Sequence, residues 1–205
     1  MSVKQGRGAK PSAFVLLNDM DIIEQIKTFA PKCEQEMRDK AVMLAFLTGH
    51  ADAFERTNPL AHMTASAWIL SPDRTKAAMC YHNIYNSWSW TGGHADGDRD
   101  LLAVALREAG EETGVTCRPL EEDIFSLEIL TVDGHMKNGV WIPGHTHMNV
   151  TYLLCAEGEA LRPKPDENRA VRWMTPEEAL AASTEPWMVK HVYRKLVERA
   201  KPYMR

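Results

Sequence analysis

The sequence predicts an α+β fold, because helical and strand-like patterns follow one another without a regular βαβ repeat. Apolar residues recur at helical spacing between residues 22 and 29, whereas short apolar runs at residues 65–70 and 77–81 are typical of strands. With 205 residues, the chain is long enough for one domain with a sizeable core and an appendage.

The composition is that of an ordinary globular protein. Hydrophobic residues make up 44% and charged residues 25%, which excludes disordered and fibrous classes. The net charge of −4 gives no reason to expect binding to nucleic acid or to an anionic membrane. The chain has no apolar run of about 18 residues and no apolar core of a secretory signal near its start, so we expect a cytoplasmic protein. The cysteines lack metal-ligand spacing and are expected to be reduced thiols: Cys33, Cys80, Cys117 and Cys155.

The first part of the chain predicts a helical N-terminal extension, residues 1–57. Asn18 is expected to cap a helix that ends before Pro31, and a second helix should stop at Gly49. The polar stretch at residues 56–59 marks the boundary with a main domain, residues 58–205. The extension would cover the sheet, form a homodimer interface or shape a pocket, and the sequence leaves these alternatives open.

The main domain shows clear turn and cap signals. Residues 71–74 read Ser-Pro-Asp-Arg, a β-turn sequence that joins two strands in a hairpin. A helix is expected at residues 100–113, with Gly114 as its stop. Residues 175–178 carry the cap, first-turn proline and capping-box glutamate of another helix. Further strands are expected at 124–132, 140–142, 148–155 and 170–174, and a final helix at 187–200.

Glutamates gather on one face of the helix expected at residues 100–113. Glu108, Glu111 and Glu112 stand at i, i+3 and i+4. Such acidic triples are usually solvated faces, yet each like-charged pair destabilises a helix by about 0.2–0.5 kcal/mol, and Gly110 adds a cost of about 1 kcal/mol. Local stability therefore does not explain the segment. A hard divalent cation, Mg²⁺ or Mn²⁺, would make clustered carboxylates favourable.

The pair Gly92-Gly93 precedes this helix and permits a close approach of the main chain. A backbone carbonyl there could join the carboxylates on one metal ion. A divalent cation that keeps several waters and binds a substrate phosphate activates water and offsets phosphoryl charge. The residues therefore indicate hydrolysis of a phosphate anhydride.

The segment from Gly93 to Val115 resembles the signature box of the Nudix hydrolases. Its residues in the family's register are Arg107, Glu108, Glu111, Glu112 and Gly114. The resemblance implies an α/β/α sandwich in which a mixed sheet carries a loop–helix–loop catalytic segment. It also implies cleavage of a nucleoside diphosphate linked to another moiety, by water attack at phosphorus with Mg²⁺ or Mn²⁺.

The resemblance implies roles for individual residues. Glu111 and Glu112 would be metal ligands, the Gly92 carbonyl an additional ligand, and Glu108 a ligand or the general base. Arg107 would orient a glutamate of the cluster through a charge-assisted hydrogen bond.

Glu167 lies six residues before Trp173, just ahead of an expected strand. In the family, a carboxylate in this region often completes the metal site or serves as the base. The alternative is a solvated loop residue.

Arg99 departs from the pattern, because the family has a glutamate at that position. Either the activity survives with help from a neighbouring aspartate, or the positive charge of Arg99 weakens metal binding. The second outcome motivates an alternative function, a Nudix-fold module that senses a nucleotide with weak or no turnover.

A further alternative is an isomerase of the isopentenyl diphosphate type. Such an enzyme needs a catalytic thiol and a glutamate-rich motif after the box. Only Cys80 lies in the strand before the box, and no glutamate-rich motif follows the box.

Candidates for substrate contact lie outside the carboxylates. His145 and His147 alternate before an apolar strand and project to one face, where they would contact phosphate or make strand-edge hydrogen bonds. His94 follows the glycine pair, and Trp88 is able to stack on a base or to pack in the core. No motif extension identifies a particular substrate, so the expected partner is a nucleotide-type diphosphate.

Overall fold

A mixed sheet forms the centre of the computed structural model, which describes residues 21–137 and 139–205. Within these residues the sheet has eight strands, five of them in the order β10-β2-β1-β9-β5. The two long strands, β1 (Ala61–Leu70) and β9 (His145–Ala156), run parallel through its middle. The strands β2 (Ala77–His82), β5 (Cys117–Pro119) and β10 (Asn168–Met174) extend it with antiparallel pairings.

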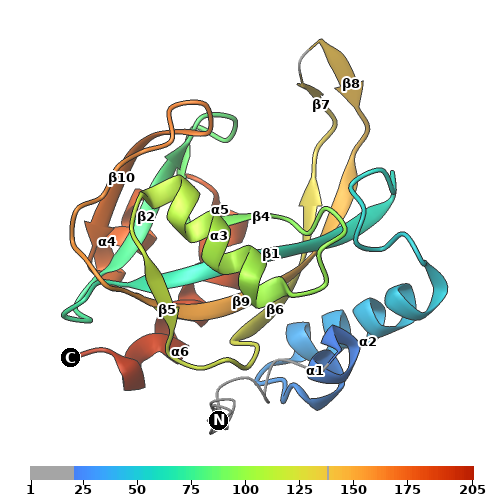
Figure 1. Ribbon diagram of the computed structural model, residues 1–205, viewed down its shortest axis with the longest axis horizontal. Helices are drawn as coiled ribbons and strands as arrows, with labels where there is room; N and C mark the ends of the chain where they lie inside the picture. The colour runs from blue at the N-terminus through green and yellow to red at the C-terminus, as the bar shows by residue number, and fades with distance from the viewer. Residues whose placement is uncertain (1–20, 138) are drawn as a thin grey trace, which may run out of the picture.

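Shorter strands pair beside this path. The strand β3 (Ser87–Ser89) pairs with β2, β4 (Thr91–His94) with β1, and β6 (Ser126–Val132) with β9. A separate hairpin of β7 (His135–Lys137) and β8 (Val140–Ile142) extends away from the rest of the molecule (Figure 1).

Helices cover both faces of the sheet, as in the expected α/β/α sandwich (Figure 1). Alternate residues of β1 face opposite ways, so that Met63 and Ala65 join one apolar cluster whereas Trp68 and Leu70 join another. The first cluster includes buried residues of α1 (Ile22–Thr28), α2 (Glu34–Gly49) and α3 (Leu101–Thr113). The second includes residues of α4 (Pro176–Ala182) and α6 (Arg194–Ala200), with the short α5 (Pro186–Met188) between those helices.

Several local signals in the sequence are confirmed. The turn at residues 71–76 joins β1 to β2 through a hydrogen bond from the Ser71 N–H to the Lys76 carbonyl, 2.9 Å long. Gly114 ends α3 in the left-handed region, with φ of 74°. Thr175 and Glu178 form the predicted capping box of α4.

Element boundaries differ from the prediction in places. Asp21 caps α1, and Asn18, the predicted cap, lies outside the described residues. The strand β1 begins four residues earlier than expected, because residues 61–64 also pair with β9. The helix expected at residues 187–200 contains a π-helical turn, Val189–Tyr193, which no apolar pattern predicts. The unpredicted strands β3, β4, β5 and β7 have only three or four residues, too few to show a period.

A buried ion pair connects the N-terminal helices to the end of the chain. Glu36 of α2 is 0% exposed and accepts hydrogen bonds from Arg199 of α6 and from the Ser126 hydroxyl. Burial by itself would raise the pKa of Glu36, but the hydrogen bond from Arg199 and the positive charge of Lys195 hold it below its ordinary value. The carboxylate therefore stays ionised inside the protein and fixes these elements against β6.

Removing the arginine tests this connection. In Arg199→Met the buried Glu36 carboxylate loses its guanidinium partner, so we expect a loss of about 3 kcal/mol in the free energy of unfolding. The matched control is Lys201→Met, which breaks an exposed pair with Glu198 and should cost less than about 1 kcal/mol. Urea unfolding measures both, and equal losses would contradict the structural role of the buried pair.

Candidate metal centre and active site

The helix α3 positions the expected site. The Asp100 side chain accepts a hydrogen bond from the Ala103 N–H at its start, and Gly114 ends it. Its apolar residues pack against β1 and β4, and they are Leu101, Leu102, Val104, Ala105 and Ala109. Because residues 108 and 112 lie one turn apart on this helix, both glutamates reach the glycine pair of β4.

Glu112 is the more deeply buried of these two glutamates, at 4% exposure. Its Oε1 accepts a hydrogen bond of 2.8 Å from the Gly92 N–H. A Cβ at Gly92 would lie 2.3 Å from the Ser66 hydroxyl oxygen and 2.8 Å from the Ala65 carbonyl oxygen. A glycine is therefore needed for the close pairing of β4 with β1 that directs this N–H toward the carboxylate.

Glu108 packs directly on Gly93. A Cβ at that glycine would lie only 2.4 Å from the Glu108 carboxyl carbon, so a larger residue would displace the carboxylate. The Arg107 guanidinium lies 3.5 Å from Glu108 Oε1 and 3.7 Å from Asp98 Oδ2. The contact with Glu108 is thus an ion pair, longer than the charge-assisted hydrogen bond expected from the sequence.

Glu167 joins these carboxylates from a different part of the chain. One carboxylate oxygen each of Glu108, Glu112 and Glu167 lie within 4.8 Å of one another, and we call these residues the carboxylate group. The buried Asn168 donates a hydrogen bond of 3.0 Å to the Glu112 carbonyl and accepts one of 3.2 Å from the Lys164 N–H. Asn168 therefore ties the loop before β10 to the end of α3 and brings Glu167 into the group.

Without a cation, ionisation of the carboxylate group is unfavourable. Burial raises the pKa of Glu112 to about 8, and burial followed by the charge of Glu111 raises the pKa of Glu108. Lys164 lies 2.8 Å from Glu111 and 2.9 Å from Glu167 and offsets part of the negative charge. Oxygen ligands at this separation, with a high cost of ionisation, fit a hard divalent cation.

Glu111 is placed differently from the other predicted ligands. Its side chain is 46% exposed and pairs with Lys164 beside the carboxylate group. Sequence reasoning missed Lys164 and Asn168, because their contacts with α3 depend on how the loop before β10 folds back. The signal available in the sequence was the spacing of Lys164 and Glu167, three residues apart, which permits an ion pair.

Arg99 points onto the N-terminal part of the chain. Its guanidinium carbon lies 4.6 Å from the centre of the Phe54 ring. The loop preceding it is held to the same segment by the Arg56–Asp96 ion pair and by a hydrogen bond of 3.0 Å from the Gly97 N–H to the Phe54 carbonyl. The arginine at this position is thus accommodated by a cation–π contact.

The candidate histidines lie together. His145 and His147 share a face as expected, and His94 and His62 complete what we call the histidine cluster, with ring centroids 5.0–5.1 Å apart in five of the pairs. Burial, followed by the neighbouring histidines, lowers the pKa of His147 to about 2, and burial lowers the pKa of His62. His62 was missed because only the parallel register of β1 with β9 brings it opposite His147.

Two other candidate residues, Trp88 and Cys80, are packed among neighbouring side chains. Trp88 packs edge-on against Tyr81 at 5.4 Å and lies under the Arg172 guanidinium, partly buried against the second apolar cluster. Cys80 is fully buried, and burial followed by the charge of Glu112 raises the pKa of its thiol far above the ordinary value. Such a thiol is a poor nucleophile, which argues against an isomerase with a catalytic cysteine.

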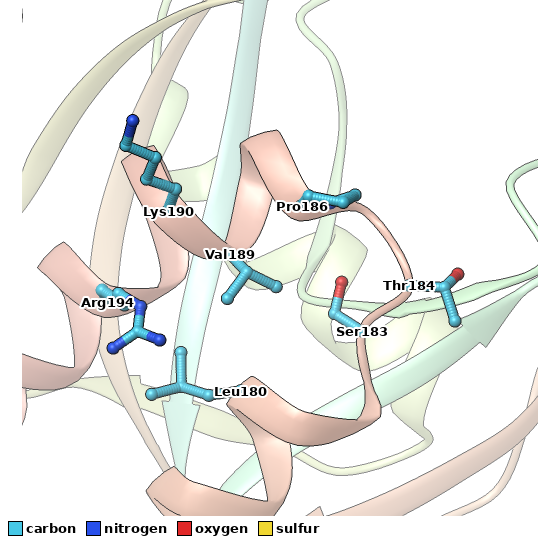
Figure 2. A pocket seen from close by; sticks show the side chains of 7 residues that line it. All are labelled: Leu180, Ser183, Thr184, Pro186, Val189, Lys190 and Arg194. Atoms are coloured by element: carbon cyan, nitrogen blue, oxygen red, sulfur yellow. The ribbon is translucent and has the colours of Figure 1, made fainter.

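A separate hollow of about 460 Å³ opens between α4 and the helical segment that follows it (Figure 2). It is lined by Leu180, Ser183, Thr184, Pro186, Val189, Lys190 and Arg194. None of its lining residues belongs to the carboxylate group or the histidine cluster. Among the described residues, no helix has the length and apolar character needed to cross a membrane.

Solved structures with a similar fold include a UDP-X diphosphatase, with a TM-score of 0.50, 15% identity, and coverage of 89% of this chain and 90% of that one. An Ap4A hydrolase from C. elegans has a TM-score of 0.47 and 17% identity, over 69% of this chain and 96% of that one. A dihydroneopterin triphosphate pyrophosphohydrolase from E. coli has the same score and identity, over 67% and 96%. The likeness to the diphosphatase shows the fold.

Comparison of the sequence with protein-family models identifies the family of this chain. No curated protein sequence matches the chain significantly. The family model described as NUDIX domain matches residues 60–197, which is more than half of the chain and includes α3 with its glutamates. The chain therefore belongs to the Nudix family.

Proposed function

We propose that this protein is a metal-dependent pyrophosphohydrolase that cleaves the diphosphate linkage of a nucleoside diphosphate derivative by water attack at phosphorus. The observation that carries the proposal is the carboxylate group, in which α3 and the loop before β10 bring carboxylates together beside a glycine pair. Because burial makes ionisation of Glu112 and Glu108 costly, a cation bound among the carboxylates would stabilise their ionised forms.

Mg²⁺, with Mn²⁺ as the alternative, fits these oxygen donors. Glu108, Glu112 and Glu167 would hold the ion, and Glu111 and the Gly92 carbonyl are proposed as further ligands. When bound, such an ion supplies Lewis-acid polarisation of a phosphoryl oxygen and lowers the pKa of coordinated water.

The protein's own groups have distinct tasks in this proposal. The Gly92 N–H fixes the orientation of Glu112, and Arg107 orients Glu108. Whichever of Glu108 and Glu167 does not hold the ion is placed to accept the proton of the attacking water. Lys164 keeps Glu111 and Glu167 on the same side of the group.

The cellular setting remains the one predicted from the sequence. The cysteines at 33, 80, 117 and 155 are free, which supports a cytoplasmic enzyme that acts on a small molecule. The homodimer and the domain boundary at residue 57 stay predictions.

A substrate panel tests the proposal. Nucleoside diphosphate sugars, dinucleoside polyphosphates and nucleoside triphosphates are each incubated with Mg²⁺, with Mn²⁺ or with EDTA, and phosphate-containing products are measured. We expect cleavage of one class at the diphosphate linkage, dependent on the metal. Absence of metal-dependent cleavage across the panel would contradict the hydrolase.

Glu112→Gln tests the carboxylate group. The substitution keeps the hydrogen-bonding shape but removes the charge that would face the cation, so kcat should fall at least about 100-fold. The matched control is Glu177→Gln, an exposed glutamate of α4, which should leave kcat unchanged. Circular dichroism checks the fold of both variants, and a loss below about tenfold for Glu112→Gln would count against the site.

Arg99→Glu separates the hydrolase from the nucleotide-sensing alternative. Because Arg99 lies over Phe54, reversing its charge should change kcat by less than about fivefold through screened electrostatics alone. Steady-state kinetics and nucleotide binding are measured together. A large rise in turnover with unchanged binding would instead favour a module that senses a nucleotide.

A further inference from the structure

We propose that His62, His145 and His147 form a second metal site, distinct from the carboxylate group, which binds a transition-metal dication and is best matched by Zn²⁺. The proposal does not depend on the hydrolase activity, because it rests on imidazole donors that the proposed reaction does not use. We call these residues the histidine triad.

The sheet brings the histidine triad together. The strands β1 and β9 run parallel with His62 directly opposite His147, and His145 lies two residues earlier on the same face of β9. One ring nitrogen of each of the three lies within 4.8 Å of the others. The donors thus come from two central strands rather than from a mobile loop, which is the rigid placement that a metal site needs.

Distances within the histidine triad match a tetrahedral zinc site. The Nε2 atoms of His145 and His147 are 3.3 Å apart, and the ring centroids of the triad are 5.0, 5.1 and 5.1 Å apart. Zinc–nitrogen bonds of about 2.0–2.1 Å in tetrahedral geometry place two donor nitrogens about 3.3 Å apart and their ring centroids roughly 5 Å apart. The rings therefore have the required spacing already.

Hydrogen bonds to the backbone select the tautomer that binds a metal. His62 Nδ1 lies 3.2 Å from the Asn58 carbonyl oxygen, and His145 Nδ1 lies 2.9 Å from the Pro143 carbonyl oxygen. A carbonyl only accepts, so each Nδ1 carries the hydrogen and each Nε2 is left with a lone pair. Metal-bound histidines commonly have this second interaction with a backbone carbonyl.

The Nε2 atom of His62 has no partner among the described residues, although it is buried. The whole residue is only 3% exposed, so water does not replace the missing hydrogen bond freely. A buried acceptor left without a hydrogen bond is unfavourable for the folded protein. A metal ion shared with the His145 and His147 nitrogens would satisfy it.

The donors determine the kind of metal. The histidine triad offers imidazole nitrogen without a carboxylate, which suits Zn²⁺ and its neighbours rather than Mg²⁺. Three protein ligands leave a fourth position open to water or an anion. His94 borders the triad, at 5.0 Å from both the His62 and His147 rings, and it follows Gly93, which packs on Glu108. The two sites are therefore neighbours along β4.

Zinc binding to the full chain without a purification tag tests the proposal. Equilibrium dialysis with Zn²⁺ is run with millimolar Mg²⁺ present to compete at the carboxylate group, and Co²⁺ replaces Zn²⁺ for visible absorption. We expect one Zn²⁺ per chain and the intense bands of tetrahedral Co²⁺, both retained in Glu112→Gln. Affinity should fall about 100-fold or more in His147→Gln and in His145→Gln.

His50→Gln is the matched control, because this exposed histidine follows α2 and stacks on Phe46. It should bind Zn²⁺ like the unaltered chain. Unfolding in EDTA checks the variants, and His145→Gln, at a half-buried position, serves if His147→Gln does not fold. The proposal would be overturned by the absence of Zn²⁺ binding, by triad variants that bind Zn²⁺ as tightly as the unaltered chain, or by loss of binding in Glu112→Gln.

Discussion

The site depends on holding three carboxylates close together, two of them largely shielded from water. Glu108, Glu112 and Glu167 converge within 4.8 Å although burial makes ionisation of the first two costly. The arrangement also requires the glycine pair in β4, which is unfavourable for an isolated strand. Such costs persist at functional sites, and a divalent cation is the ligand that would reverse them.

The remainder of the fold holds this arrangement from two sides. The Asn168 side chain ties the loop that carries Glu167 to the end of α3. On the other side, Arg56 and Phe54 hold the loop between β4 and α3, through an ion pair with Asp96 and a contact with Arg99. The segment before β1 is thus part of the support for the site, and the buried Glu36 ion pair connects that segment to α6.

Sequence reasoning succeeded where the signal is local. The helix around Glu108 and Glu112, its stop at Gly114 and the capping box of α4 all follow from spacings of a few residues. It failed where the contact depends on long-range register: His62 meets His147 only through the parallel pairing of β1 with β9. Asn168 was missed for the same reason, since its partner belongs to α3. The histidine cluster therefore emerged from the fold, whereas the glutamates were visible in the sequence.

Mn²⁺ binding shows whether carboxylates from two distant segments of the chain form one metal centre. Calorimetric titration with Mn²⁺ compares the unaltered chain with Glu167→Gln and with Asp166→Asn, an exposed neighbour in the same loop. We expect at least about tenfold weaker binding for Glu167→Gln and unchanged binding for Asp166→Asn, because Glu167 and not Asp166 joins the α3 glutamates. Equal affinities of all three proteins would contradict it.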